Sequence, residues 1–476
     1  MALPRQRDDF PGWYQAVVKG AEMAETSLVR GTMVIRPYGF EVWERIQSAV
    51  DRRIKATGHA NLYFPLLIPY RLLEKEAEHV EGFAPEVAVV THAGGEELDE
   101  PLVVRPTSET IIWDTYAKWI QSYRDLPLLY NQWANVVRWE RRPRLFLRTT
   151  EFLWQEGHTA HETAEEAMAE ARLILTDVYR AAVEEDLAVP VRLGRKSRAE
   201  RFAGAVETYT LEALMRDGKA LQAGTSHYLG QNFARAYDVR FLGRDGKENF
   251  AYATSWGAST RLIGGLIMAH GDDHGLRLPP HLAPVQVVIV PIYRTDEERS
   301  TTLEAAGKIR HEVGELGVRV RVDDREEHRP GYKFNEWELK GVPLRLEIGP
   351  RELGSGEAVC YRRDTGEKRP LVLAGLGSRI PELLEEVQAE LFRQAASFRD
   401  ERTFSPDRYE ELRELVENPG GFVVARWCGS PVCEEKVKVD TRATIRTLTL
   451  DPEPVDGSCI VCGRPAKERA AWAQSY

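Results

Sequence analysis

Two arginines lie where a charged side chain is costly, and both are candidates for holding an anion. Arg138 lies among apolar and aromatic neighbours, with Glu140 two positions later. Arg261 opens the almost wholly apolar stretch 262–268. A guanidinium buried among apolar residues needs an anionic partner, and the N-terminus of a helix already favours phosphate. We therefore expect Arg261 to clamp a polyphosphate. The alternative is a structural salt bridge to a nearby carboxylate.

The segment that follows Arg138 is predicted to form the floor of a pocket. Residues 133–158 have the pattern of two strands joined by an arginine-rich turn. The period of two places Arg138 and Glu140 on one face of the first strand. It also places four residues on one face of the second strand: Phe152, Trp154, Glu156 and His158. Aromatic walls with polar tips result, and an ordinary sheet with surface salt bridges is the alternative.

Four cysteines near the C-terminus form two close pairs, Cys428 with Cys433 and Cys459 with Cys462. In a cytoplasmic chain this clustering favours metal over disulfides. Four thiolates match a tetrahedral structural zinc site, with no ligand position left open for catalysis. A chance group of surface cysteines is the alternative. The fifth, Cys360, lies in an apolar run and is predicted to be a packed strand thiol.

The first half of the chain must supply the elements that position these residues. A helix is predicted over 37–57, with a proline in its first turn, and an apolar strand over 62–68. An amphipathic helix is predicted over 161–186. A strand leading into a buried helix is predicted over 248–270. Prolines and glycines in 270–284 indicate a linker.

The pattern changes after the linker. A short apolar strand over 287–290 precedes a helix whose apolar stripe spans 303–316. Half-exposed strands are predicted at 318–322 and 344–348. This order predicts a small α/β domain with a partly parallel sheet. A charged helix over 380–400 then leads to the cysteine-bearing tail.

Composition indicates a globular chain. The 476 residues are 43% hydrophobic and 29% charged, and would form roughly three domains. No apolar run reaches the ~20 residues needed to cross a bilayer, and no secretory signal is evident, so we expect a cytoplasmic protein. The net charge of −10 gives no global attraction to nucleic acid, so local basic patches must decide. Residues 138–148 and 192–201 are locally basic; a solvated face is an equally good interpretation of the second stretch.

Together these features resemble a known family. The helix with its proline-ended strand, the arginine-x-glutamate with its arginine-rich loop, and the strand leading into the arginine-bearing helix resemble motifs one, two and three of class II aminoacyl-tRNA synthetases. Residues 105–110 and 223–227 are similar to the amino-acid-binding elements of prolyl-tRNA synthetases. The domain order resembles their archaeal and eukaryotic form. Thr260 departs from the general class pattern, in which many relatives carry glutamate, and we interpret it as a prolyl-type feature.

The resemblance implies an α+β fold in three parts. A class II catalytic domain over 1–278 would contain an antiparallel sheet flanked by helices. An α/β anticodon-binding domain would span 284–380, and a small C-terminal α/β zinc domain would span 400–476. Such catalytic domains dimerise through motif one, so a homodimer is expected.

The resemblance also implies a reaction. ATP would activate L-proline to prolyl-adenylate, and the prolyl group would then pass to the 3′ end of tRNA(Pro). The expected catalytic residues are Arg138 and Arg261. The expected proline-binding residues are Thr107, Glu109, Arg138, Phe152, Trp154, Glu156, His158 and His227. The expected ATP-binding residues are Arg138, Glu140, Thr149, Thr150, Gln222, Thr225, Ser259 and Arg261, with Mg²⁺ accompanying the nucleotide.

Three further expectations concern tRNA, editing and the C-terminus. Glu338 and Arg345 are candidates for contacting anticodon guanines, although both could equally be surface salt-bridge partners. No editing domain is expected, because the short segment between motifs two and three is needed to complete the catalytic sheet. The sequence leaves open whether the terminal Tyr476 reaches the active site.

Two alternatives are of a different kind. Another class II synthetase, for threonine, serine or histidine, would share the three motifs. The aromatic pocket and the lack of a catalytic-site zinc constellation favour proline. A non-catalytic paralogue that only binds tRNA would have no reason to retain the separated charges of Arg138, Glu140 and Arg261. A zinc-ribbon nucleic-acid-binding protein would explain only the cysteine tail.

Overall fold

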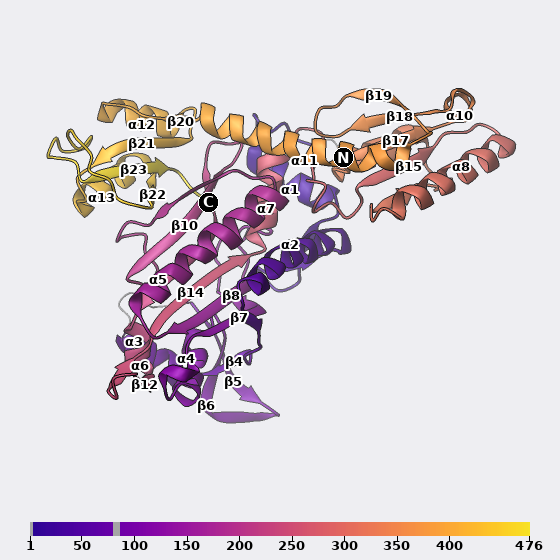
Figure 1. Cartoon of the computed structure of the whole chain (residues 1–476). Coiled ribbons are helices and arrows are strands. Elements are labelled where there is room, and N and C mark those ends of the chain that lie inside the picture. The colour runs from indigo at the N-terminus through magenta and orange to yellow at the C-terminus, as the bar shows by residue number, and fades with distance from the viewer. Residues whose placement is uncertain (1–2, 80–85) are drawn as a thin grey trace.

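A computed structural model describes residues 3–79 and 86–476. The first half of the chain forms a tall central body, and two smaller lobes lie on opposite sides of its upper end (Figure 1). The orange lobe at the right follows the body in the chain, and the yellow lobe at the left is C-terminal. Helix α11 (Leu376–Glu401) runs across the top of the body between the two lobes.

An eleven-stranded sheet runs through the body in the order β20-β21-β23-β22-β9-β10-β11-β14-β8-β7-β3. Its strands are β3 (Ala60–Asn61), β7 (Leu128–Val137), β8 (Glu151–His161), β9 (Val191–Arg195), β10 (Glu207–Leu214), β11 (Ala220–Gly230), β14 (Tyr252–Ser259), β20 (Thr403–Phe404), β21 (Phe422–Trp427), β22 (Thr444–Leu448) and β23 (Glu468–Ala473). The central strands from β9 to β7 are antiparallel. This confirms the antiparallel sheet expected for the class II core.

Helices pack on the sheet through apolar faces. They are α1 (Phe10–Gly20), α2 (Pro37–Ala56), α5 (Ala164–Leu173), its π-helical continuations Ile174–Arg180 and Ala182–Asp186, and α7 (Arg261–His270). Trp13, Ile46, Val178 and Ile263 are buried in one apolar core that joins these helices to the sheet. The helices predicted over 37–57 and 161–186 are confirmed, as is the strand–helix unit over 248–270, formed by β14 and α7.

The single strand predicted over 62–68 is wrong. The chain pairs with β7 at β3 and then leaves the sheet. It forms β4 (Leu67–Pro69) in a different sheet. Leu62 still donates its amide hydrogen to the Asn131 carbonyl at 2.9 Å, but Pro65 has no amide hydrogen with which to continue the ladder.

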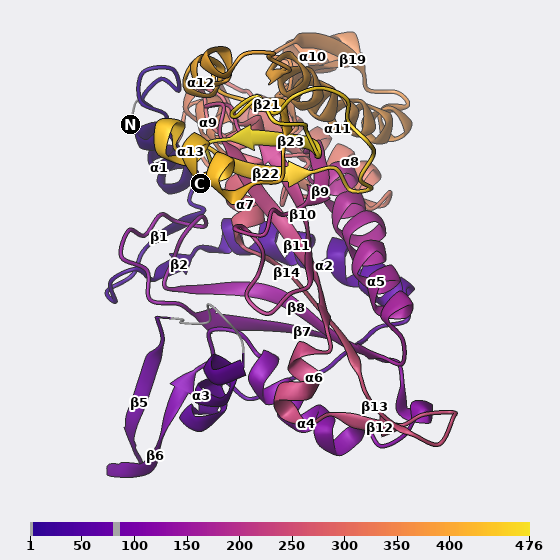
Figure 2. The same cartoon turned by 90° about the vertical axis from the view of Figure 1, so that its left-hand side faces the viewer.

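The lower end of the body is built from smaller units (Figure 2). A three-stranded sheet has the order β4-β6-β5. The remaining elements of the body are β1 (Ala24–Thr26), β2 (Met33–Ile35), α3 (Tyr70–His79), β5 (Ala88–Ala93), β6 (Glu96–Val104), α4 (Glu109–Trp119), the 3₁₀ turn Tyr123–Asp125, α6 (Asn232–Tyr237), β12 (Arg240–Leu242) and β13 (Glu248–Phe250). Helix α4 begins at Glu109, within the segment 105–110 that resembles an amino-acid-binding element.

The orange lobe is an α/β domain. Its sheet has the order β16-β15-β17-β18-β19, with β15 parallel to both neighbours and β17 to β19 antiparallel. Its elements are β15 (Val287–Pro291), α8 (Asp296–Gly314), β16 (Val320–Val322), α9 (Pro330–Leu339), β17 (Leu344–Ile348), α10 (Pro350–Ser355), β18 (Glu357–Arg362) and β19 (Lys368–Val372). The predicted partly parallel sheet is confirmed, and Cys360 is buried in β18 as expected.

The C-terminal lobe continues the sheet of the body. It contains β20 to β23 with helices α12 (Tyr409–Glu417) and α13 (Pro431–Thr441). Its β22 pairs with β9 of the body at Leu448 and Arg195, and Figure 2 shows the two strands side by side. The last residues also join the body, because Tyr476 donates its amide hydrogen to the Ala220 carbonyl at 3.2 Å. No local pattern in the sequence indicated this shared sheet.

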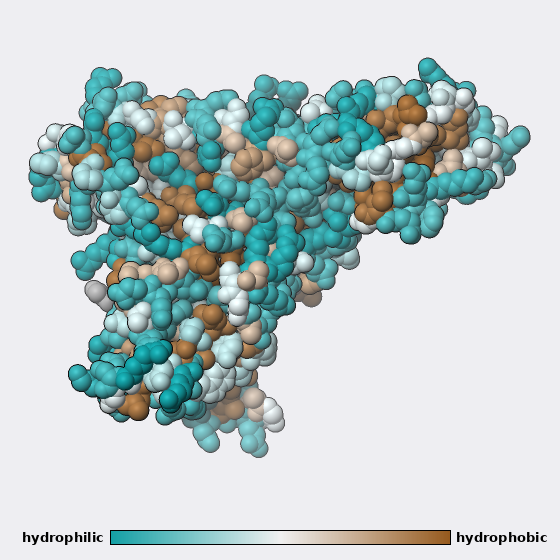
Figure 3. Space-filling model, in the orientation of Figure 1, coloured by the Kyte–Doolittle hydropathy of each residue, from teal (hydrophilic) through white to brown (hydrophobic). Residues whose placement is uncertain are grey.

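The molecular surface is mostly polar. Teal residues predominate on the face drawn in Figure 3, with scattered brown patches on the body and on the α/β lobe. Within the described residues, helices long and apolar enough to cross a membrane are absent.

Gly157 allows a close approach that the sheet needs. It lies on β8 between Glu156 and His158, and a Cβ atom there would lie 2.1 Å from the Trp256 ring. We expect Gly157→Ala to destabilise the protein by about 1–3 kcal/mol through overpacking, measured as a fall in Tm by calorimetry. The matched control is Gly307→Ala in the middle of α8, where a Cβ atom meets nothing within 4 Å. The control should stabilise by ~0.5–1 kcal/mol. An unchanged Tm in Gly157→Ala would contradict the close packing.

Candidate active site

One cavity over the middle of the sheet gathers most of the predicted site residues. Its volume is about 300 Å³. It lies over β8, β11 and β14, with the start of α4 and the start of α7 at its edges. The predicted residues that line it are Thr107, Glu109, Arg138, Phe152, Trp154, Glu156, His158, Gln222, Thr225, His227, Ser259 and Arg261. Segments far apart in the chain therefore meet at one hollow.

A second cavity, of about 270 Å³, adjoins the first. Both are lined by Arg138 and Arg261, so the two guanidinium groups lie where the hollows meet. Glu140 and Thr149 line the second cavity only. Thr150 lines neither, because it is buried and its hydroxyl oxygen accepts a hydrogen bond from the Glu140 amide at 3.4 Å. Thr150 thus braces the loop behind the cavity.

The strand geometry predicted for Arg138 and Glu140 is wrong. Strand β7 ends at Val137, so both residues lie in the loop that follows it. The loop is held by backbone contacts: the Arg138 amide donates to the Thr150 carbonyl at 2.8 Å. The partner strand behaves as predicted, because the side chains of Phe152, Trp154, Glu156 and His158 all line the first cavity.

Arg138 is a desolvated cation. Its Nε donates to the Pro106 carbonyl at 2.9 Å, and its guanidinium carbon lies 5.1 Å from the centre of the Trp154 ring. Burial lowers its pKa, although the negative charges of Glu109 and Glu156 oppose that shift. Arg138 forms no ion pair with any residue that the structure describes. The group therefore retains the capacity to bind an anion.

Arg261 has the same character. It is the first residue of α7, and its Nε donates to the Leu147 carbonyl at 3.2 Å. Burial and the positive charges of Arg148 and Arg138 lower its pKa to about 10. Among residues 3–74 and 86–476, whose side chains the structure describes, Arg261 has no ion-pair partner, so the structural salt bridge considered as an alternative is not formed there. An arriving anion would relieve this repulsion between cations.

The opposite end of the cavity is acidic. Glu109 is buried, and one of its oxygens accepts a hydrogen bond from the Thr107 hydroxyl. Glu156 accepts from Gln132 Nε2 at 2.8 Å and from the Ser108 hydroxyl at 2.5 Å. Both carboxylates are therefore buried in the lining of the cavity.

His158 joins the two acidic residues. Its Nε2 lies 3.1 Å from a Glu156 oxygen. Although burial opposes the charged form, the hydrogen bond to Glu156 and the charge of Glu109 raise the pKa of His158. Ligand atoms of these three residues lie within 4.8 Å of one another, a cluster that the sequence did not reveal. Because protein donors already occupy the Glu156 oxygens, Glu109 is the carboxylate of this cluster that can still accept hydrogen bonds from a ligand.

His227 is held neutral. Burial, followed by the charge of His158, lowers its pKa to about 3. Its Nδ1 lies 3.0 Å from the Thr208 hydroxyl oxygen, and its ring stacks on Phe202 at a centroid distance of 4.5 Å. His227 therefore supplies shape and a hydrogen bond to the cavity, and no charge.

Sequence reasoning missed one wall of the cavity. Lys196, Glu200, Phe202 and Thr208 also line it. The basic stretch 192–201 contained the signal, but a solvated face was an equally good interpretation. That interpretation fails for Lys196, whose ammonium is buried and lies 2.7 Å from a Glu212 oxygen.

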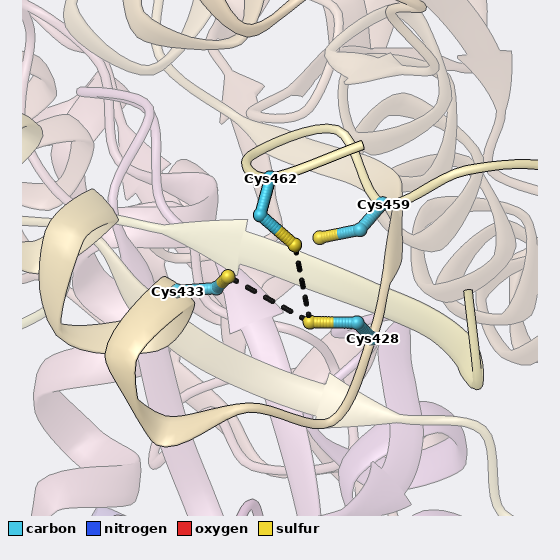
Figure 4. Close-up of side chains that lie close together, drawn as sticks. All are labelled: Cys428, Cys433, Cys459 and Cys462. Carbon is cyan, nitrogen blue, oxygen red and sulfur yellow. Dashed lines mark hydrogen bonds between the residues drawn. The ribbon is translucent and has the colours of Figure 1, made fainter. Parts of the chain in front are cut away.

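The four C-terminal cysteines converge on one point (Figure 4). The Cys428 sulfur lies 3.6 Å from that of Cys433 and 3.7 Å from that of Cys462. All four sulfur atoms, including that of Cys459, lie within 4.8 Å of one another. Tetrahedral thiolates bound at ~2.3 Å from zinc would be separated by about 3.8 Å, so the cluster fits zinc.

The candidate anticodon residues lie together in the α/β lobe, away from the cavity. The Arg345 guanidinium carbon lies 4.3 Å from the ring centres of both Phe334 and Tyr361. Its Nη2 donates to Glu347 at 2.9 Å, so Arg345 is a buried, paired cation and not a surface residue. Glu338 accepts a hydrogen bond from the Tyr361 hydroxyl at 2.7 Å.

Tyr476 lies behind the active site. Its hydroxyl donates to Asp217 at 2.7 Å, and it borders a separate small cavity with Tyr14 and Arg144. It lines neither of the two cavities that Arg138 and Arg261 share.

The antiparallel sheet, the arginine-bearing loop after β7 and the arginine at the start of α7 define a class II aminoacyl-tRNA synthetase. Residues 90–270 match the family described as "tRNA synthetase class II core domain (G, H, P, S and T)". Residues 286–383 match "Anticodon binding domain", and residues 409–476 match "Prolyl-tRNA synthetase, C-terminal".

The chain belongs to the prolyl-tRNA synthetases, the proline–tRNA ligases. It is 55% identical to the proline–tRNA ligase of Chlorobium phaeobacteroides, with 98% of each chain covered. It is also 55% identical to that of Rubrobacter xylanophilus, with 100% of this chain and 98% of the relative covered. A crystal structure of prolyl-tRNA synthetase from Cryptosporidium parvum, complexed with Halofuginone and AMPPNP, has a TM-score of 0.95 at 40% identity. That match covers 100% of this chain and 99% of the other.

The lowered pKa of His227 predicts an acid sensitivity. Its folded pKa of about 3 lies below the ordinary value of 6.5, so the unfolded chain binds the proton first as pH falls. The contribution of neutral His227 to the free energy of unfolding is fully present above pH ~6.5. That contribution should fall by roughly 2–3 kcal/mol by pH 4.5. We expect His227→Gln to show a smaller drop in Tm between pH 7.5 and 4.5 than the parent protein, measured by calorimetry. The exposed His274→Gln is the control, and an equal drop in parent and His227→Gln would contradict the assignment.

Proposed function

We propose that the two joined cavities bind L-proline and ATP, form prolyl-adenylate, and then charge tRNA(Pro). The observation that carries this proposal is the position of Arg138 and Arg261. Both guanidinium groups are buried, neither has a carboxylate partner among the described residues, and both border the two hollows. Two cations so placed would hold a triphosphate against a second anion in the first cavity.

L-Proline fits the first cavity by its charges and its ring. Its secondary ammonium would lie at the acidic end, where Glu109 can accept hydrogen bonds from the ammonium N–H groups, with Thr107 beside it. Its ring would pack against Phe152 and Trp154. Its carboxylate would then point to Arg138, because that guanidinium lies over the Trp154 ring. Glu156, His158 and His227 would hold the floor beneath the ring.

ATP would occupy the second cavity and extend into the first. Arg138 would hold the α-phosphate, since a guanidinium can bind two oxygens at once. Arg261 would hold the γ-phosphate. Glu140 would accept a hydrogen bond from the adenine amine, with Thr149 beside it, and Gln222, Thr225 and Ser259 would line the nucleotide. AMPPNP in the related Cryptosporidium parvum structure supports a nucleotide here.

The chemical step needs no covalent bond to the protein. A proline carboxylate oxygen forms a bond to the α-phosphorus, and the bond to the pyrophosphate oxygen breaks. The two arginines stabilise the negative charge that shifts among the carboxylate and phosphate oxygens during the step. The rigid sheet keeps the reacting groups aligned. Mg²⁺, when bound with ATP, would neutralise further phosphate charge. A ribose hydroxyl oxygen at the 3′ end of the tRNA then attacks the prolyl carbonyl carbon and loses its proton, the bond from that carbon to the phosphate oxygen breaks, and AMP leaves.

Several partners and properties follow from this role. Glu338 and the aromatic-flanked Arg345 would contribute to anticodon recognition in the α/β lobe.

A second copy of the chain would pack against the first through the motif-one region, where Leu28, Val34 and Tyr63 are exposed apolar residues. The location would be the cytoplasm. Misactivated alanine would have to be cleared elsewhere, because the segment between motifs two and three builds β9 to β11 and α5.

Pyrophosphate exchange tests the function directly. Exchange should depend on proline among the twenty amino acids, with weak activity on alanine and cysteine, because losing a methylene costs only about 1–3 kcal/mol. Arg138→Ala should lower exchange by a factor of about 10³ or more, while chromatography shows an unchanged dimer. The matched control is Arg141→Ala, an exposed arginine of the same loop whose side chain pairs with Glu86. Exchange that depends on threonine or serine and not on proline would refute the proposal.

We also infer that the cysteine cluster holds a structural zinc ion. Cys459→Ser should reduce bound zinc from about one ion per chain to nearly none, and should lower the Tm, because structural zinc contributes folding energy directly. Metal content can be measured by mass spectrometry. Cys360→Ser, in the α/β lobe, is the control and should keep its zinc. Full zinc content in Cys459→Ser would contradict the four-thiolate site.

A further inference from the structure

The wall of the first cavity that follows β9 has no regular secondary structure of its own. Residues 196–202, here called the 196–202 wall, form turns between β9 and β10. Lys196, Glu200 and Phe202 of this wall line the cavity. One backbone hydrogen bond ties the wall to β10, from the Lys196 amide to the Thr208 carbonyl at 2.8 Å. Beyond that bond the side-chain contacts of the wall contribute to the shape of the cavity at this side.

The C-terminal lobe supplies the contacts at the start of the wall. Ser197 donates its hydroxyl hydrogen to Glu434 of α13, and both side chains are buried. Arg195, the last residue of β9, pairs with Glu468 of β23 at 2.8 Å. Its Nε also donates to the Thr449 carbonyl at 2.9 Å. The wall therefore leaves β9 from a point where the body is joined to the C-terminal lobe.

A buried charge cluster holds the next part of the wall. Glu212 on β10 accepts from Lys196 Nζ at 2.7 Å, and from Arg446 Nε at 3.0 Å and Nη2 at 2.9 Å. Arg446 lies on β22, and its Nη1 is 3.7 Å from a Glu200 oxygen. A carboxylate as buried as Glu212 needs both cations to compensate its lost hydration. Arg446 therefore positions Lys196 through their shared partner Glu212. Arg446 also attracts Glu200 to the same cluster.

The far end of the wall reaches the amino-acid end of the cavity. Phe202 stacks on His227, and its amide donates to the Thr208 hydroxyl at 3.1 Å. The same hydroxyl is hydrogen-bonded to His227 Nδ1 at 3.0 Å. A shift of the wall would therefore move Phe202 and His227, which border the space assigned to the proline ring.

We propose that Glu434 and Arg446 of the C-terminal lobe are positioning residues for the amino-acid cavity, acting by holding the 196–202 wall. This inference rests on the proposed function and assigns the lobe a part in recognising the amino acid. Neither residue borders the cavity itself. Their effect is therefore expected on proline binding. Arg446 also acts electrostatically on Arg261, so a variant that keeps the positive charge at this position should change the KM for ATP much less than the KM for proline.

The test is a KM comparison in pyrophosphate exchange. Ser197→Ala and Glu434→Ala should each raise the KM for proline by roughly five- to tenfold, with kcat and the KM for ATP little changed. If both act through one hydrogen bond, the double variant should be no weaker than either single variant. Glu434→Gln keeps an acceptor for Ser197 and should remain close to the parent. Arg446→Lys keeps the charge, loses the two-pronged contact with Glu212, and should raise the KM for proline in the same way.

The controls separate this effect from loss of structure. Glu435→Ala changes the exposed neighbour on α13 and should leave both KM values unchanged. Zinc content and Tm of each variant report on the fold of the lobe. Equal rises in both KM values, unchanged values in all variants, or additive effects in the double variant would overturn the inference. A parent protein without proline-dependent exchange would instead refute the proposed function.

Discussion

Two buried guanidinium groups that have no carboxylate partner among the described side chains are the constraint on which the rest of the site depends. Arg138 and Arg261 are desolvated and repel each other, so the apo state carries an electrostatic cost that a bound anion would remove. Flexible elements would relax this cost by moving the charges apart. The antiparallel sheet resists that movement because β8 pairs with β7 on one side and with β14 on the other, which leads directly into α7.

The first cavity has opposite electrostatic character at its two ends. Glu109 and Glu156 lie at one end and Arg138 at the other, an arrangement complementary to a zwitterion. The acidic end is also ordered in advance, because Ser108, Gln132 and His158 fix the Glu156 carboxylate before any ligand arrives. Such preorganisation lowers the cost of ordering the site when the substrate binds.

Much of the fold and site could be predicted because the signals are local. The alternating face of Phe152, Trp154, Glu156 and His158 follows from the period of a strand, and Arg261 follows from its place before an apolar helix. The break at Pro65 also has a local signal, because a proline has no amide hydrogen with which to continue a strand ladder. The 196–202 wall could not be predicted, because Ser197 and Glu434 are 237 positions apart and no local pattern links them. The position of Arg138 depends on a loop, whose course is set by backbone contacts with Thr150.

The pairing of β22 with β9 has a consequence for biosynthesis. The strands that close the sheet are translated long after β9, because Arg195 meets the Thr449 carbonyl 254 positions further along the chain. While the nascent polypeptide is on the ribosome, β9 is an uncovered edge, and uncovered edges invite pairing with foreign strands. Completion of the sheet must therefore wait until β22 has been translated.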